Sequence, residues 1–190
     1  MKSTELKKYQ KILDVRGLEY GGFNHAKAHY EFLKETFNTS YSLKIADLGC
    51  GVGKFPLWIK DNFPQHIVIG IEPVFLPNSS DYPQVSWING DSTNIPLEHV
   101  DILTSFDVME HIHPDEIEKS LKEIARVTDH YICKICTKPS KSKGVDGEDL
   151  HPTVKPLIWW EDQLLRYFDH VKVVDGCLLW AVNNPKTKSN

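Results

Sequence analysis

The stretch Lys44–Lys54, which reads KIADLGCGVGK, decides the fold of this 190-residue chain. An apolar segment runs into three alternating glycines, Gly49, Gly51 and Gly53, and a helix-forming segment follows. Glycine is needed where the backbone takes a positive φ or approaches a ligand closely. In open α/β sheets, ligands bind beyond the carboxyl ends of the strands, where this turn lies. The stretch therefore predicts a strand–turn–helix unit with a nucleoside-type site at its turn.

On both sides of this unit, short apolar runs alternate with amphipathic segments, which is typical of an α/β sheet. The expected strands are 43–48, 66–71, 85–88, 100–106, 130–136, 170–174 and 177–182. Helices are expected over 4–13, after Asn24, from Pro114 and from Pro156. The segment 73–84 contains three prolines and predicts a loop or a single turn. The last two strands flank an Asp-Gly turn and predict an antiparallel hairpin.

Composition limits the kind of protein. With 41% hydrophobic and 25% charged residues, residues 1–190 suit one globular domain. The net charge of -4 argues against a sequence-independent DNA binder. No apolar run approaches the roughly 20 residues of a membrane span, and the charged N-terminus lacks a signal core, so we expect a cytoplasmic protein. The four cysteines predict free thiols, because the lone pair Cys133 and Cys136 lacks the partners of a zinc site.

The residues around the glycine turn indicate which nucleoside binds. Gly53 comes one residue too early for the dinucleotide fingerprint, and Asp47 would repel a pyrophosphate. A carboxylate there favours a ligand with an ammonium group and no phosphate, such as S-adenosylmethionine (SAM). Glu72 ends the second strand, where its carboxylate accepts from a ribose diol. After the third strand, Asp91 is placed to accept from the adenine amino group, with the Ser92 N–H facing a ring nitrogen.

The segments DLGCGVGKF, VIGIEP, NGDSTNIPL and SFDVMEHI together resemble the successive motifs of class I SAM-dependent methyltransferases, over about residues 43–136. The resemblance implies a three-layer α/β/α sandwich with a seven-stranded, mostly parallel sheet and an antiparallel last strand. It implies SAM as the cofactor and S-adenosylhomocysteine (SAH) as its product. The residues that it assigns to the cofactor are Asp47, Gly49, Cys50, Gly51, Gly53, Glu72, Asp91, Ser92 and Phe106. The family tends to have a helix where this chain has the proline-rich segment, so the wall beside the adenine departs from the pattern.

The loops after the fourth and fifth strands bring histidines toward the acceptor side. We expect His111 and His151 to be catalytic, as the base or as contacts of the methyl acceptor, since histidine has a near-neutral pKa. The alternative is that His111 and His113 only cap the helix that begins at Pro114. Asp107-x-x-Glu110-His111 also resembles the E-x-x-E-H metal cluster of small-RNA 2′-O-methyltransferases and some quinone-biosynthesis O-methyltransferases, with His151 as a fourth ligand. Similar enzymes use an E-H pair without metal, and we expect no metal here.

These features predict methyl transfer from SAM to an oxygen of a small molecule, because the chain has no added recognition domain. An RNA or nucleotide methyltransferase that uses the lysines of 134–143 is an alternative, as is a catalytically silent SAM-binding protein. Residues 1–40 are expected to form a helical lid that includes 20–25, although a glycine turn with a helix cap explains 20–25 equally well. We expect Trp160 in the core, and 183–190 as a polar tail. The sequence leaves the oligomeric state open.

Overall fold

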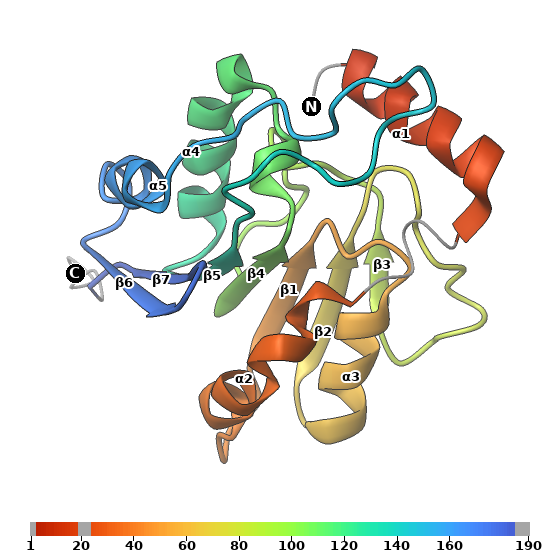
Figure 1. Ribbon diagram of the computed structural model, residues 1–190. Helices are drawn as coiled ribbons and strands as arrows, with labels where there is room; N and C mark the ends of the chain where they lie inside the picture. The colour runs from red at the N-terminus through yellow and green to blue at the C-terminus, as the bar shows by residue number, and fades with distance from the viewer. Residues whose placement is uncertain (1–2, 19–23, 185–190) are drawn as a thin grey trace.

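The computed structural model describes residues 3–18 and 24–184. Its centre is a seven-stranded sheet in the order β3-β2-β1-β4-β5-β7-β6 (Figure 1). The strands are β1 Lys44–Leu48, β2 Ile67–Ile71, β3 Ser86–Ile88, β4 Ile102–Phe106, β5 His130–Lys134, β6 His170–Asp175 and β7 Leu178–Val182. Strands β1 to β5 pair in parallel, whereas β7 pairs antiparallel with both β5 and β6. The predicted seven-stranded sheet with one antiparallel last strand is confirmed.

Helices cover both faces of this sheet, so the three-layer prediction is also confirmed (Figure 1). The helices are α1 Ser3–Arg16, α2 Tyr30–Phe37, α3 Lys54–Asn62, α4 Ile117–Val127 and α5 Leu157–Leu164. Helices α2 and α3 pack on one face against side chains such as Ile45, and α4 and α5 pack on the other against neighbours such as Ala46. Successive residues of β1 therefore serve opposite cores, as the twofold period of a strand requires. None of the helices in the described ranges has the length and apolar character needed to cross a membrane.

The predicted core positions are buried. The stripe of α4, with Leu121 at its centre, faces the sheet, and each such side chain contributes about 1.5–3 kcal/mol by burial. Trp160 is fully buried, as expected. All four cysteines are free. The segment 73–84 contains bends and turns and no helix, which confirms that expectation.

Most element boundaries differ from the prediction by a few residues, and at His66 and Pro114 the reason can be identified. β2 begins at Ile67 rather than His66, because the His66 ring leaves the strand pattern to bridge two backbone groups. Its Nδ1 accepts from the Leu43 N–H at 3.1 Å, and its Nε2 lies 2.8 Å from the Phe37 carbonyl. At Pro114 the chain first makes a 3₁₀ turn, and α4 begins at Ile117.

The two helices within the predicted lid of residues 1–40 lie in different places, and the lid itself stays a prediction. α1 lies over the carboxyl edge of the sheet, where Tyr9 and Ile12 pack with Phe75 and Leu150 in a small third core. α2 instead belongs to the layer beside α3, and its Leu33 is fully buried there. Of the described residues in 1–40, α1 lies at the cavity edge and α2 lies in the helical layer. Residues 19–23 and 185–190, which hold most of the 20–25 segment and the polar tail, lie outside the described ranges.

Candidate active site

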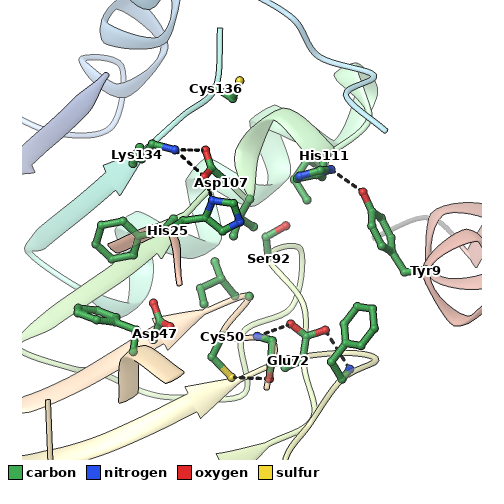
Figure 2. Close-up of a pocket in the computed structure, with 18 of the residues that line it drawn as sticks. Tyr9, His25, Asp47, Cys50, Glu72, Ser92, Asp107, His111, Lys134 and Cys136 are labelled. Atoms are coloured by element: carbon green, nitrogen blue, oxygen red, sulfur yellow. Dashed lines mark hydrogen bonds and ion pairs between the residues drawn. The ribbon is translucent and has the colours of Figure 1, made fainter. Parts of the chain in front are cut away.

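A cavity of about 930 Å³ opens at the carboxyl ends of β1, β2, β4 and β5. Its walls come from the turns that follow these strands, from α1 and from the loop after β5 (Figure 2). This is the edge at which open α/β sheets bind their ligands. The predicted residues that line it are Asp47, Gly49, Cys50, Gly51, Glu72, Asp91, Ser92, Phe106, His111 and His151. Of the predicted site residues, only Gly53 is not in the lining.

The glycine turn has the backbone conformation that its sequence predicts. Gly49 and Gly51 have φ values of 72° and 54°, in the left-handed region that favours glycine. A Cβ at Gly49 would lie 2.5 Å from a methyl group of Val108, so the turn and the loop after β4 pack against each other. At Gly53 the φ is also positive, at 81°, and a further reason favours glycine. A Cβ at this position would lie 2.3 Å from the Trp87 ring. Packing therefore requires this third glycine, and its predicted contact with the cofactor stays a prediction.

Asp47, at the end of β1, is an almost fully buried carboxyl group at the floor of the cavity. The Thr104 hydroxyl donates to its Oδ1 at 2.8 Å. Burial raises the pKa of Asp47 to about 8. The hydrogen bond from Thr104 opposes this shift, and the charge of Glu72 adds to it. A group of this kind gains most when a cation approaches, because the cation favours the carboxylate form that burial disfavours.

Glu72, at the end of β2, fixes the shape of the turn as well as lining the cavity. Its Oε2 accepts from the Gly51 N–H at 3.0 Å, and its Oε1 accepts from Val74 and Phe75 at 3.0 and 3.3 Å. Burial raises its pKa, and these three bonds oppose the shift. A carboxylate has roughly four acceptor sites. Binding both hydroxyls of a ribose would therefore require one backbone bond to open.

The segment after β3 forms the next part of the wall. The Asp91 carboxylate accepts from the Thr93 N–H and hydroxyl, both at 2.7 Å, and this contact shapes the turn. Ser92 is buried, and its hydroxyl lies 2.8 Å from that of Ser120. Phe106 packs edge-on against Phe55 at 4.9 Å between ring centroids. The predicted adenine contacts remain predictions, now with a defined position on the cavity wall.

The acceptor side contains a cluster that the sequence did not reveal as a unit. Asp107 follows β4 with a φ of 54°, the one left-handed non-glycine residue in the described ranges. Its carboxylate oxygens lie 2.6 and 2.5 Å from the Lys134 Nζ at the end of β5, and they also contact Nδ1 of His25 (Figure 2). Although burial opposes it, these two contacts hold the pKa of Asp107 well below its usual range. The sequence singled out Asp107, the segment 20–25 and the lysines of 134–143 separately, but nothing in it indicated that Asp107, Lys134 and His25 meet.

His111 and His151 meet beside this cluster. Their rings are edge-to-face with centroids 4.6 Å apart. His111 Nδ1 lies 2.7 Å from the Leu150 carbonyl and 2.5 Å from the hydroxyl of Tyr9, an α1 residue that sequence reasoning missed. Burial, then His151, lowers the pKa of His111 to about 4, so the near-neutral pKa expected for a base is not found there.

The two capping alternatives are resolved separately. His113 caps the turn before α4, since its Nδ1 accepts from the Asp115 N–H at 3.4 Å. His111 makes no such cap, because its Nδ1 is directed to Leu150. His111 and His151 instead lie with Glu110, and one ligand atom from each falls within 4.8 Å of the others. Asp107, expected as a fourth member of that cluster, is held by Lys134 and His25.

Several solved structures share this fold. The PH0226 protein of Pyrococcus horikoshii matches with a TM-score of 0.65 and 18% identity, covering 98% of this chain and 100% of that chain. Magnesium protoporphyrin IX methyltransferase from Synechocystis PCC 6803, with bound SAH, matches with a TM-score of 0.66 and 14% identity. The match covers 96% of this chain and 95% of that chain. The Burkholderia thailandensis 1,6-didemethyltoxoflavin-N1-methyltransferase matches with a TM-score of 0.64 and 12% identity. The match covers 95% of this chain and 88% of that chain.

Residues 45–130 match the family described as "Methyltransferase domain". This match covers residues 45–130, and the fold of the whole chain is that of the SAH-bound structure above, so both findings support a class I SAM-dependent methyltransferase. No curated protein matches the chain in sequence. The chain also spans only 45% of the length of a putative methyltransferase from Anabaena variabilis.

Proposed function

We propose that this methyltransferase transfers the methyl group of SAM to an oxygen of a small-molecule acceptor. The observation that carries the proposal is the single cavity of about 930 Å³ that contains both the glycine turn and the histidine cluster. Pockets for small ligands measure roughly 300–1,000 Å³. The acceptor therefore enters the same chamber as the cofactor and fits there only if it is small.

The cofactor occupies the half of the cavity formed by the turns after β1, β2 and β3. Asp47 pairs with the ammonium group of the methionine part, close to the glycine turn. Glu72 accepts from the ribose, and the wall at Asp91 and Ser92 faces the adenine. The sulfonium then points toward the loop after β4, where Asp107 and the histidines lie.

The acceptor hydroxyl needs a base, and His25 is better suited to that role than His111. A carboxylate against Nδ1 of a histidine keeps the proton on that nitrogen and the lone pair on Nε2. Asp107, oriented by Lys134, holds His25 in this way. As the bond between oxygen and the methyl carbon forms, the bond from that carbon to sulfur breaks, and the hydroxyl proton passes to His25. His111 and His151 contact the acceptor from the other side.

The RNA alternative has less support from the positions of its lysines. Lys134 pairs with Asp107, and Lys143 pairs with Asp149 at 2.9 Å. Lys138 and Lys141 line the cavity. Two of these four lysines are therefore paired with carboxylates and two line the cavity, which gives less support to a basic surface that follows a phosphate backbone.

The test uses the purified protein with methyl-labelled SAM and a fractionated host extract, followed by mass spectrometry of the labelled products. A labelled small molecule with a new methyl ether or ester supports the proposal. Label on RNA, or on nitrogen, contradicts it. No label at all, with SAH still bound in calorimetry, would leave a silent SAM-binding protein.

The proposed base has a matched control. With the acceptor so found, His25→Gln should lower kcat by about 100-fold or more, the usual range for losing a general base. His99→Gln is the control, because His99 also lies beside an acid, Asp129 at 3.7 Å, but not in the cavity. If both variants keep the wild-type kcat, His25 is not the base.

A further inference from the structure

We propose that the methyl acceptor carries an anionic group, a carboxylate or a phosphate, in addition to the oxygen that is methylated, and that Lys138 and Lys141 bind this group. Both lysines belong to the loop after β5, and both line the cavity. The inference rests on the proposed function and deepens it, because it names the chemical class of the small acceptor and the two residues that select it.

The loop after β5 is a folded wall of the cavity, held in place by Asp149. The Asp149 Oδ1 accepts from the N–H groups of Ser140 and His151, at 3.2 and 2.9 Å. Its Oδ2 lies 2.9 Å from the Lys143 Nζ. Lys143, which is paired in this way, is not part of the cavity lining, whereas the other two lysines of the loop are. The fold of the loop therefore separates one lysine that holds the loop from two that face the cavity.

This loop starts at the acceptor end of the cavity. Figure 2 shows Cys136, from which the loop departs, at the end opposite to Glu72. Two residues further on, the Lys138 carbonyl lies 2.7 Å from Nδ1 of His151. The His151 ring in turn contacts the ring of His111, with centroids 4.6 Å apart. The backbone of Lys138 is therefore fixed beside the histidines that are proposed to contact the acceptor.

The charges on the cavity wall show which ligand would suit this end. The lining carboxylate of Asp107 is already paired with Lys134, and Lys54 begins α3, next to the glycine turn of the cofactor half. Among the described residues, neither Lys138 nor Lys141 forms an ion pair. A cleft lined by one sign of charge attracts ligands of the opposite sign. Two ammonium groups without a carboxylate partner therefore favour an anionic acceptor over a neutral or cationic one.

The neighbouring side chains and the cofactor support the same choice. Ser140 and Ser142 also line the cavity, and their hydroxyl groups can donate alongside the two lysines. Hydrogen bonds from an ammonium group to a carboxylate or a phosphate are among the strong ones. The sulfonium of SAM adds a positive charge that disappears on methyl transfer. An anionic acceptor is therefore attracted more strongly before the reaction than its anionic product is afterwards.

The first test identifies the charge of the acceptor. The host extract is passed through an ultrafiltration membrane that retains RNA, and the filtrate is separated on an anion-exchange resin at neutral pH. Each fraction is then incubated with the purified protein and methyl-labelled SAM. We expect the labelled small molecule in the fraction that the resin retains. Label only in the unretained fraction would overturn the inference and leave the proposed function standing, whereas label on the retained RNA would overturn both.

The second test uses the acceptor so found to examine the two lysines. The double variant Lys138→Gln with Lys141→Gln should raise KM about tenfold or more and leave kcat within about twofold, because the contact is the same in substrate and transition state. Added salt should raise the KM of wild type more than that of the double variant, since screening weakens only the charge attraction. The control, Lys119→Gln with Lys172→Gln, removes the same charge from exposed positions outside the cavity and should leave KM unchanged. A folded double variant with the wild-type KM would overturn the inference.

A binding measurement decides the anion site separately should no acceptor be labelled, in which case the proposed function fails. The SAH-bound protein is titrated with inorganic phosphate and with benzoate, each followed by ligand-observed NMR. Saturable binding of either anion supports the site if the Lys138 and Lys141 double variant weakens it at least about fivefold and the control does not. The anion that binds identifies the group as phosphate or carboxylate. No saturable binding of either anion, or binding that the double variant leaves unchanged, would overturn the site.

Discussion

Replacing Glu72 by glutamine tests the cofactor site with the smallest change in shape. The Gln carbonyl oxygen can take the place of Oε1 and still accept from Val74 and Phe75. Its amide NH₂ then faces the Gly51 N–H, donor against donor, and that 3.0 Å bond is lost. The opposite orientation loses two bonds instead of one. Either way the glycine turn loses the charged acceptor that holds it, and the ribose loses a carboxylate.

The expected effect follows from one charge-assisted hydrogen bond. Such a bond is worth about 1.5–3 kcal/mol, so the Kd for SAH should rise about 10- to 150-fold. Calorimetric titration with SAH measures it, and thermal unfolding checks that the variant is folded. Glu98→Gln, at an exposed glutamate outside the cavity, is the matched control and should leave the Kd unchanged. A folded Glu72→Gln protein whose Kd stays within about twofold of wild type would refute the assignment.

Two further substitutions test other parts of the site. Asp47→Asn should abolish most SAH affinity, because an amide cannot pair with the ammonium group. The pKa of Asp47 rises from 3.8 to about 8 on folding, so the folded state binds the carboxyl proton more tightly than the unfolded state does. The stabilisation that this proton provides is full below pH 4 and is lost as the pH rises through 8. Urea unfolding at pH 5 and pH 9 should therefore show a larger loss of stability in wild type than in Asp47→Asn. Gly53→Ala should destabilise the protein by about 1–3 kcal/mol through overlap with Trp87, and more than Gly147→Ala, whose φ of 82° is similar but whose Cβ would meet nothing within 4 Å.

The cofactor side could be predicted from sequence because its groups follow consecutive parallel strands. Asp47 and Glu72 each stand at a strand end, and β1 and β2 pair in register, with Leu48 opposite Ile71. The carboxyl ends of such strands meet at one edge whatever the side chains do. The order of strands and glycines was therefore enough to place these carboxylates in one cavity.

The acceptor side could not be predicted to the same extent, because its contacts join distant loops. Tyr9 reaches His111 across 102 positions, and Lys134 reaches Asp107 across 27. Sequence spacing says nothing about which way a loop side chain turns. The left-handed φ of Asp107 in particular has no signal in its sequence. Gly53 shows that a glycine in a binding pattern can also be required by packing, here against Trp87, so its predicted cofactor contact stays a prediction.

The buried carboxyl groups at the two ends of the cavity share one electrostatic cause. Burial raises the pKa of Asp47 at the cofactor end and of Glu110 at the acceptor end, where the charge of Asp107 adds to it. Among the described residues, neither group forms an ion pair with a lysine or arginine, although the neighbouring Asp107 pairs with Lys134. A buried carboxyl group without a cationic partner favours its neutral form. On the proposed function, the ammonium group of the bound cofactor supplies that partner to Asp47, and SAH should then stabilise the folded chain in proportion to the logarithm of its concentration above its Kd.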